Sequence, residues 1–336
     1  MKRIIFTSVL TTMVALLTSA GNYSVRVFLP EEMNGKMAKI INFDNSQTVD
    51  SALVENGEVT FLGSIEEAIP ARLIVDGNKM NRFMLESGTI VITDEGEIAG
   101  GRYNERNNAI NKNVQELYVR YQNAETEEQQ EAILNEYNEY MTRVMNENLD
   151  NPIGYLIFLD KGYEMAPEEL EKFVADNPYF TKYQRVNKLL EANRNKIATS
   201  EGKKFVDFEI EYEGQTHRLS DVVGKGDYVL VDFWASWCGP CIRQTVVLKD
   251  IYKEYKDKGL KILGVAVWDE PENTLRAIEQ HELPWVSWLN GQSVPTDIYG
   301  ISGIPCIILF GPDGTILSRD KQSDELKADV AKYVNG

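Results

Sequence analysis

The sequence predicts a chain of three parts: an N-terminal antiparallel β-sandwich or barrel, a helical middle region, and an α/β domain at the C-terminus. Short alternating runs separated by glycine turns indicate the first part. Apolar residues at helical spacing indicate the second, and a continuous apolar run leading into a helical pattern indicates the third. The expected boundaries are 1–20 for a signal peptide, 21–101 for the β-rich domain, 102–198 for the helical region and 199–336 for the α/β domain.

The first twenty residues have the layout of a cleavable secretory signal. Lys2 and Arg3 precede an apolar stretch over residues 4–17, and small residues ending at Ala20 follow it. This stretch is too short to cross a bilayer comfortably, so we expect cleavage after Ala20 and no transmembrane anchor afterwards. Because no cysteine lies near that point, a lipid anchor on a mature N-terminal cysteine is excluded. We therefore expect the mature protein in the periplasm or cell envelope.

The β-rich part consists of short runs of strand-forming residues, each bounded by a turn signal. The predicted strands cover 23–28, 38–41, 58–62, 71–75, 82–85 and 89–92. Asn-Gly, Asp-Gly and Ser-Gly pairs between them are typical of tight turns. No motif in this part carries chemistry, so a scaffold role is favoured over a docking role.

Residues 104–198 change to helical periodicity. The apolar stripes contain Val114, Leu117, Tyr118 and Tyr121, then Leu134, Tyr137, Met141 and Val144. Pro152 and Pro167 stand at expected first helical positions, and Pro178 is expected to begin the last helix. Packing of a core by these stripes is favoured over a ligand groove. The segment 198–204 is the expected linker.

The C-terminal part contains the most informative motif, Trp-Cys-Gly-Pro-Cys at 237–241. The apolar run 228–234 before it predicts a buried parallel strand, and helical spacing follows it. A thiolate at a helix N-terminus faces unpaired N–H groups and the positive end of the macrodipole, which lowers a thiol pKa from about 8.5 towards roughly 3.5 to 7.5. We therefore expect Cys238 to be exposed and to attack, with Cys241 covered one turn further on.

The segment 231–241, together with Gly-Ile-Pro-Cys at 303–306, resembles the thioredoxin superfamily. Pro305 lies 64 positions after Cys241, a spacing that is similar to the TlpA- and ResA-like exported thiol-disulfide oxidoreductases, which carry an extra helix there. Residues 205–222 resemble the leading hairpin of that group, and the β-rich N-terminus resembles a domain that precedes it in some exported proteins. The resemblance implies a thioredoxin fold for residues 199–336.

The resemblance also implies roles for individual residues. A proline at the position of Pro305 is cis in this family and leaves a backbone edge free for a substrate chain. Asp232 interrupts an apolar strand, and a buried lone carboxylate shifts its pKa upward or finds a function. In the family an aspartate there accepts the proton of the second cysteine, here Cys241; the alternative is a satisfied core aspartate. The residues expected to contact the substrate are Trp237, Gly239, Pro240 and Ile304.

Three further residues have two interpretations each. Asp269 and Glu270 follow the predicted strand 262–267 and either tune the thiols or are solvated loop acids. Cys306 stands where the family usually has threonine. A buried free cysteine that behaves as a small hydrophobe is favoured for it, and the alternative is a third thiol that traps a partner or binds metal.

Other site types fit the sequence less well. A zinc site needs a second Cys pair or histidines at matching spacing, and the other Cys and His residues are scattered. A Cu(I) site formed by the three cysteines, a static structural disulfide, and a peroxidase lacking its usual Pro/Thr/Cys signature are the remaining alternatives. The formal net charge of −17 argues against nucleic acid as a partner. We expect no metal and no cofactor beyond the redox-active disulfide.

The predicted function is protein dithiol-disulfide exchange in the envelope, most simply as a reductase. Gly239-Pro240 is the pair found in thioredoxin, whose potential is about −270 mV, whereas the oxidant DsbA lies near −120 mV. The expected partners are thiol- or disulfide-bearing envelope proteins and a membrane electron-donor protein. The alternatives are a disulfide oxidase or isomerase, or an envelope binding module or metal-delivery protein that uses the cysteines as ligands.

Overall fold

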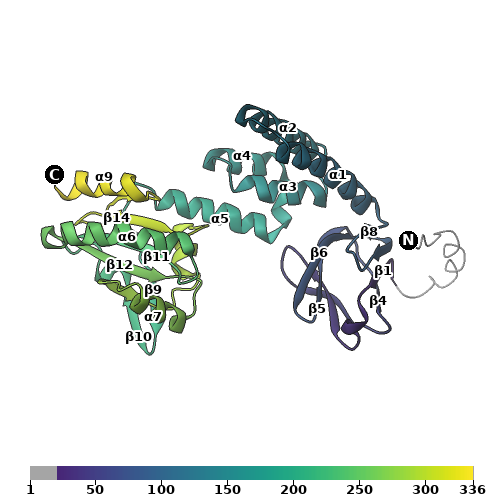
Figure 1. Cartoon of the computed structure of the whole chain (residues 1–336), viewed down its shortest axis with the longest axis horizontal. Helices are drawn as coiled ribbons and strands as arrows, with labels where there is room; N and C mark the ends of the chain where they lie inside the picture. The colour runs from purple at the N-terminus through teal and green to yellow at the C-terminus, as the bar shows by residue number, and fades with distance from the viewer. Residues whose placement is uncertain (1–20, 336) are drawn as a thin grey trace, which may run out of the picture. The chain divides into compact units, whose positions relative to one another are not determined.

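The computed structural model describes residues 21–335 (Figure 1). The predicted signal peptide and its cleavage site lie outside the described residues. Within this range, no helix is long and apolar enough to cross a membrane. The chain divides into two compact units, one ending at Asn187 and the other beginning at Lys188.

The first unit begins with two four-stranded sheets, ordered β4-β1-β7-β8 and β3-β2-β5-β6. The strands are β1 (Tyr23–Phe28), β2 (Met37–Asn42), β3 (Thr48–Leu53), β4 (Glu58–Gly63), β5 (Ile69–Val75), β6 (Asn78–Leu85), β7 (Gly88–Ile92) and β8 (Ile98–Ala99). Apolar side chains from both sheets, such as Val25, Phe61, Ile40 and Leu73, share one buried core. The predicted β-rich domain is therefore confirmed.

Two features of this domain differ from the expected all-antiparallel set of six strands. β1 and β7 pair in parallel, whereas the pairs within the other sheet are antiparallel. β3 and β8 were not predicted. β3 contains Asp50 and Ser51 and has no buried residue, so it lacks the alternation that marks a strand, and its pairing with β2 defines it instead.

The chain after the β-rich domain is helical, as predicted, and the last of its helices crosses the boundary between the two units. The helices are α1 (Arg102–Gln122), α2 (Glu127–Asn146), α3 (Pro152–Gly162), α4 (Pro167–Asp176) and α5 (Gln184–Ala198), with the 3-10 turn η2 (Pro178–Lys182) before α5. Pro152 and Pro167 open their helices as expected. The expected helix start at Pro178 is wrong: α5 begins at Gln184, where the carboxylate of Asp44 accepts hydrogen bonds from the backbone N–H groups of Gln184 and Arg185. Such a distant cap leaves no local sequence signal.

The second unit is built on a five-stranded mixed sheet with the order β13-β12-β11-β14-β15 (Figure 1). Its elements are β9 (Glu209–Tyr212), β10 (Gln215–Arg218), η3 (Leu219–Asp221), β11 (Tyr228–Trp234), α6 (Gly239–Tyr255), η4 (Lys256–Lys258), β12 (Leu260–Ala266), α7 (Pro271–Gln280), β13 (Val286–Trp288), α8 (Val294–Tyr299), β14 (Cys306–Phe310), β15 (Ile316–Arg319) and α9 (Ser323–Val334). β11 pairs in parallel with β12 and antiparallel with β14. The predicted thioredoxin fold and leading hairpin, β9 and β10, are confirmed.

The two faces of this sheet bury different cores. One core contains Leu230 and Trp234 of β11, both cysteines of the predicted pair, and residues of α6 and α9. The opposite core contains Val231 and Phe233 of β11 together with Cys306, β9 and Tyr299. Because successive strand residues point to opposite faces, the alternation along β11 decides which side chains can reach the cysteine pair.

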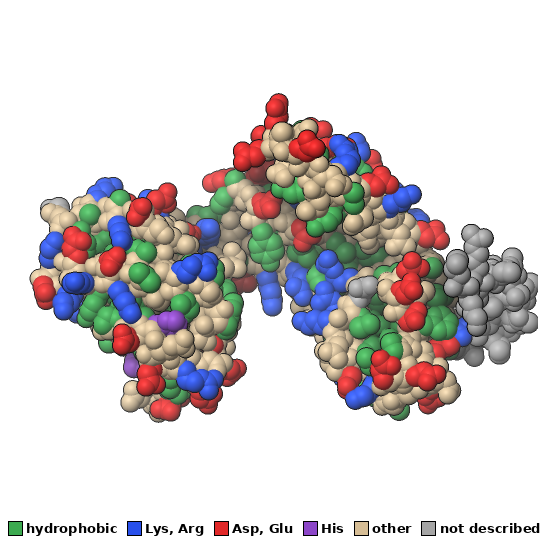
Figure 2. Space-filling model, viewed as in Figure 1, with side chains coloured by type: hydrophobic (Ala, Val, Ile, Leu, Met, Phe, Trp, Pro, Cys, Tyr) green, Lys and Arg blue, Asp and Glu red, His purple; other side chains and the backbone are tan. Residues whose placement is uncertain are grey.

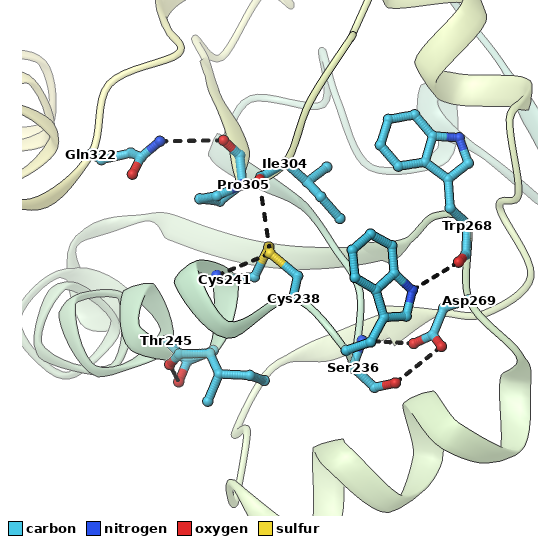
Figure 3. Close-up of a disulfide and its surroundings, with 11 residues drawn as sticks. Ser236, Cys238, Cys241, Thr245, Trp268, Asp269, Ile304, Pro305 and Gln322 are labelled. Carbon is cyan, nitrogen blue, oxygen red and sulfur yellow. Dashed lines mark hydrogen bonds between the residues drawn. A yellow bond between two sulfur atoms is a disulfide. The ribbon is translucent and has the colours of Figure 1, made fainter. Parts of the chain in front are cut away.

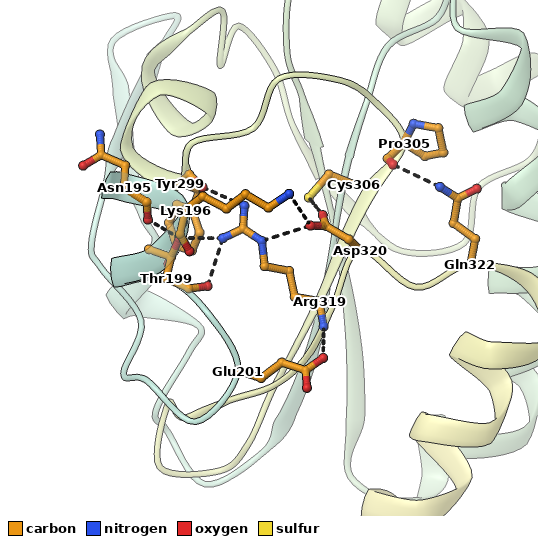
Figure 4. A network of polar contacts seen from close by, with 10 residues as sticks. All are labelled: Asn195, Lys196, Thr199, Glu201, Tyr299, Pro305, Cys306, Arg319, Asp320 and Gln322. Carbon is orange, nitrogen blue, oxygen red and sulfur yellow. Dashed lines mark hydrogen bonds and ion pairs between the residues drawn. The ribbon is translucent and has the colours of Figure 1, made fainter. Parts of the chain in front are cut away.

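The segment 198–204, expected to be a linker, is instead a packed part of the second unit. Thr199 is fully buried, and the guanidinium of Arg319 on β15 donates to its carbonyl and hydroxyl oxygens at 2.9 and 2.5 Å (Figure 4). The same guanidinium donates to the carbonyl of Tyr299 at 2.7 Å. Thr199, one of the small polar residues that suggested a linker, is an acceptor for a buried cation, and the boundary between the units falls inside α5.

Candidate active site

The cysteine pair lies where β11 ends and α6 begins, and its sulfurs form a disulfide of 2.05 Å (Figure 3). Cys238 is the N-cap of α6, and its Sγ accepts a hydrogen bond from the backbone N–H of Cys241 at 3.2 Å. Cys241 is fully buried. Cys238 is 4% exposed, so the expected exposure of this residue is not found in the disulfide form, where the Ile304 side of the site covers it.

The cis-proline segment lies directly against the disulfide. The Ile304–Pro305 peptide bond is cis, as the family resemblance implies. The carbonyl oxygen of Ile304 lies 3.7 Å from the Sγ of Cys238, and the carbonyl of Pro305 accepts a hydrogen bond from the side chain of Gln322 at 3.3 Å (Figure 3). Ile304 and Pro305 are each half-buried, so this edge is partly open to solvent.

The residues expected to contact the substrate lie around the same opening. Trp237 is 61% exposed, and its indole N–H donates to the carbonyl of Trp268 at 2.9 Å (Figure 3). Gly239 and Pro240 are exposed in the first turn of α6. By contrast, Trp234 is fully buried in the core that holds the disulfide. An apolar ring held in place beside an exposed helix turn is suited to contact another chain.

Asp232 is buried on the same face of the sheet as the disulfide. It alternates with Leu230 and Trp234, which both belong to the core containing the two cysteines. It is 1% exposed, and its Oδ1 has no hydrogen-bond partner in the described part of the chain. Burial raises the pKa of Asp232 to about 7. A carboxyl group with that pKa can accept a proton near neutral pH, as general bases do.

The neighbours of Asp232 in the sheet explain why nothing offsets its burial. Its register partners are Gly264 on β12 and Ile307 on β14, and neither has a polar side chain. A side chain at position 264 would be tightly packed, because its Cβ would lie 2.7 Å from the Oγ of Ser287 and 3.1 Å from the Nε1 of Trp234. Neither neighbouring strand therefore supplies an ion-pair partner for Asp232 at this level of the sheet.

Asp269 is a buried structural carboxylate, not a solvated loop acid. It is 5% exposed and accepts hydrogen bonds from the backbone N–H of Ser236 at 2.7 Å and from the hydroxyl of Ser236 at 3.0 Å (Figure 3). It also accepts from the hydroxyl of Thr274 at 2.8 Å and from the backbone N–H of Glu270 at 3.0 Å. Glu270 is exposed. Since Ser236 lies two residues before Cys238, Asp269 positions the segment that carries the active-site cysteine. The sequence allowed two roles for Asp269 and did not indicate Ser236 or Thr274, because their hydrogen bonds with Asp269 form only in the folded chain.

Cys306 faces away from the disulfide. It lies opposite Phe233 in the register of β11 and β14 and belongs to the other core. Its thiol donates to the Oδ1 of Asp320 at 3.0 Å (Figure 4), and burial, followed by the negative charge of Asp320, raises its pKa. A buried thiol held in this way is a poor nucleophile, so the favoured interpretation as a core residue fits the structure better than a trap for a partner.

The geometry gives no support to a joint metal site of the three cysteines. Cys238 and Cys241 lie on one face of the sheet and Cys306 on the other. Residues 21–335 contain no group of three or more His, Cys, Asp or Glu side chains arranged to hold a metal ion.

Two family models match the chain. The AhpC/TSA family model covers residues 202–319, and a domain of unknown function, DUF4369, covers residues 23–105. The chain is 31% identical over 122 residues to the thiol-disulfide oxidoreductase ResA of Geobacillus thermodenitrificans, a match that spans 36% of this chain and 69% of that protein. It belongs to the ResA-like thiol-disulfide oxidoreductases. The predicted superfamily and enzyme class are thus confirmed.

The chain is also similar to further proteins. ResA of Bacillus thuringiensis subsp. konkukian is 25% identical over 156 residues, spanning 46% of this chain and 82% of that protein. Among solved structures, the thioredoxin domain of a thiol-disulfide oxidoreductase from Bacteroides vulgatus is 35% identical, with coverage of 40% of this chain and 99% of that one and a TM-score of 0.37. The chain is thus a ResA-like thiol-disulfide oxidoreductase that contains the Cys-x-x-Cys pair Cys238 and Cys241.

Replacing Asp232 by Asn tests the cost of its burial. The carboxyl ionises near its ordinary pKa of 3.8 in the unfolded chain and near 7 in the folded one, so the stability of the wild-type protein falls as pH rises between these values. Asn does not ionise. We expect the difference in the free energy of unfolding between oxidised Asp232→Asn and oxidised wild type to change in favour of the variant by up to about 4 kcal/mol as the pH rises from 4 to 8. Urea unfolding at each pH measures this difference. The exposed Asp257→Asn variant is the control, and parallel curves for Asp232→Asn and wild type would contradict the burial argument.

Replacing Asp269 by Asn tests the positioning of the cysteine segment. In the asparagine one of the two oxygens is replaced by an NH2 group, which donates hydrogen bonds and cannot accept them. The backbone N–H of Ser236 or that of Glu270 then loses its acceptor and points at another donor. We expect the free energy of unfolding to fall by about 2 to 3 kcal/mol, together with slower disulfide exchange in an insulin-reduction assay. The neighbouring exposed Glu270→Gln is the matched control. If the two variants behave alike, Asp269 does not hold this segment.

Proposed function

We propose that this ResA-like oxidoreductase is a protein disulfide reductase of the periplasm or cell envelope. The observation that carries the proposal is Asp232, a buried carboxyl without a compensating partner on the disulfide side of β11, whose pKa burial raises to about 7. A base in this position assists the buried Cys241, which is the thiol that must lose its proton when the reduced pair finishes an attack. The pair Gly239-Pro240, as in thioredoxin, favours the same direction.

The first half of the reaction belongs to Cys238. In the reduced protein its thiolate is stabilised by the backbone N–H of Cys241 and by the N-terminus of the 17-residue helix α6. The thiolate attacks one sulfur of the partner's disulfide and forms a mixed disulfide. The other sulfur of the partner leaves as a thiolate and takes a proton from solvent.

The second half belongs to Cys241. Its thiol gives its proton to Asp232, and the resulting thiolate attacks the Sγ of Cys238. The bond between Cys238 and the partner breaks, and the second partner sulfur leaves as a thiolate. Two electrons have then passed to the partner, and the protein is left with the Cys238–Cys241 disulfide that the structure contains (Figure 3).

The partner chain binds at the opening between α6 and the cis-proline segment. Trp237 offers an exposed apolar ring, Gly239 and Pro240 leave the first turn of α6 uncovered, and Ile304 contributes a backbone carbonyl next to the Sγ of Cys238. Partners in the proposal are envelope proteins that carry disulfides. Because each cycle leaves the pair oxidised, a membrane electron-donor protein must reduce it again in an oxidising compartment.

The direction of exchange is tested by the reduction potential. Equilibration of the pair with glutathione or dithiothreitol buffers is expected to give a value nearer to the −270 mV of thioredoxin than to the −120 mV of DsbA. A potential above about −180 mV, in the range of the disulfide isomerases, would reject the reductase and favour an oxidase or isomerase.

The partners are tested by trapping. In Cys241→Ala the mixed disulfide has no resolving thiol, so partner proteins are expected to accumulate as conjugates that dithiothreitol releases. The control is the double variant Cys238→Ser/Cys241→Ala, which keeps Cys306. Conjugates formed equally well by the double variant would mean that Cys306, not Cys238, reacts with partners.

A further inference from the structure

Three arginine side chains surround one aromatic ring in the first unit. The guanidinium carbons of Arg72, Arg82 and Arg185 lie 5.5, 5.0 and 4.6 Å from the centroid of the Phe43 ring. All three cations therefore converge on a half-buried side chain. An aromatic ring stabilises each cation modestly, by about 0.5 to 1 kcal/mol at an exposed site, but it cannot remove the repulsion among three of them.

The arginines are held together by the fold. Arg72 on β5 and Arg82 on β6 are register partners in adjacent strands. Arg185 comes from the first turn of α5, and its Nε donates to the carbonyl of Phe43 at 2.8 Å. Figure 2 shows Lys and Arg side chains gathered on the β-rich domain where it meets the helical region. The cluster is thus built by two strands and a helix of the first unit.

The positive charge of this cluster is not balanced by ion pairs within the described part of the chain. None of the three guanidinium groups forms an ion pair with a carboxylate in the described part of the chain, and the Nε of Arg72 is buried there without a hydrogen-bond partner. Asp44 follows Phe43 in the chain, but its carboxylate oxygens accept hydrogen bonds from the hydroxyl of Tyr155 and from two backbone N–H groups of α5. In contrast, Lys182 close by is paired with Glu67 at 2.6 Å.

Three unpaired arginines are unusual in a chain with 52 acidic and 35 basic residues. Arginine presents a planar fork of N–H donors that matches carboxylate and phosphate oxygens. A carboxylate offers two oxygens in one plane, whereas a phosphate monoester offers three strong acceptor oxygens arranged around phosphorus. Donors that approach one point from two strands and a helix are matched better by the phosphate.

We propose that Arg72, Arg82 and Arg185 form a binding site for a phosphate group, with Phe43 as its floor. The site lies in the first unit and has no part in the disulfide chemistry, so it is a second function of the chain. The phosphate belongs either to a lipid headgroup, which would hold the protein at a membrane surface, or to a soluble phosphate compound.

The test uses the mature full-length chain and two probes. Calorimetric titration with inorganic phosphate, at constant ionic strength set with chloride, measures the soluble form of the chemistry. Co-sedimentation with phosphatidylcholine vesicles containing phosphatidic acid measures the lipid form, and matched vesicles containing oleic acid supply negative charge without phosphate. Because the protein is itself acidic, a general attraction to negative vesicles is not expected.

Variants locate the binding. Arg82→Gln is expected to weaken phosphate binding about tenfold, equal to about 1.4 kcal/mol, and Arg82→Lys to weaken it less, because the charge remains while the planar fork is lost. Lys182→Gln, which removes a paired cation from the neighbouring segment, is expected to leave binding unchanged. Arg82 is exposed, and circular dichroism checks that each variant is folded.

Saturable phosphate binding that depends on Arg82 supports the site. Binding to phosphatidic acid vesicles in addition identifies a lipid headgroup as the source, and its absence identifies a soluble compound. The proposal is overturned if wild-type protein shows no saturable phosphate binding, if oleic acid vesicles bind as well as phosphatidic acid vesicles, or if Lys182→Gln weakens binding as much as Arg82→Gln.

Discussion

The chemistry of this oxidoreductase depends on one hydrogen bond, from the backbone N–H of Cys241 to the Sγ of Cys238. It forms because a buried strand ends and a helix begins within a few residues, so that the N-cap of the helix is a cysteine instead of the usual hydroxyl or carboxylate residue. Satisfying a helix end and stabilising a thiolate become the same contact. The cis-proline segment, Trp237 and Asp269 are all arranged around that helix end.

The sequence could predict the elements that carry a local pattern. The run 228–234, the Cys-x-x-Cys motif at a helix start, and Pro152 and Pro167 as first helical residues are found where the pattern placed them. What the sequence could not predict was decided by tertiary partners. β3 exists because it pairs with β2, and α5 starts late because Asp44 caps it. Local propensity carries no information about either.

The candidate site divides in the same way. Motif and spacing were enough to predict that the site contains Cys238, Cys241, Pro305 and Trp237. The role of Asp269, in contrast, depends on hydroxyl and N–H donors that only the folded chain brings close to it. Asp232 lies between these cases. An acid within an apolar strand predicts burial. The lack of a compensating partner follows from Gly264 and Ile307, which lie beside Asp232 on the two neighbouring strands, and this register could not be predicted from the sequence.

The second unit contains two kinds of buried charged group: Asp232, whose Oδ1 has no hydrogen-bond partner in the described part of the chain, and Arg319, whose guanidinium is hydrogen-bonded. The guanidinium of Arg319 on β15 binds Thr199, the residue that follows α5, and Tyr299 at the end of α8. The AhpC/TSA family model begins at residue 202, after Thr199. A catalytic domain excised at the family boundary would therefore lose Thr199 and leave part of a buried guanidinium without acceptors. The second compact unit begins within α5, several residues before the segment that the family model matches, so the C-terminal part of that helix is also a structural component of the enzyme.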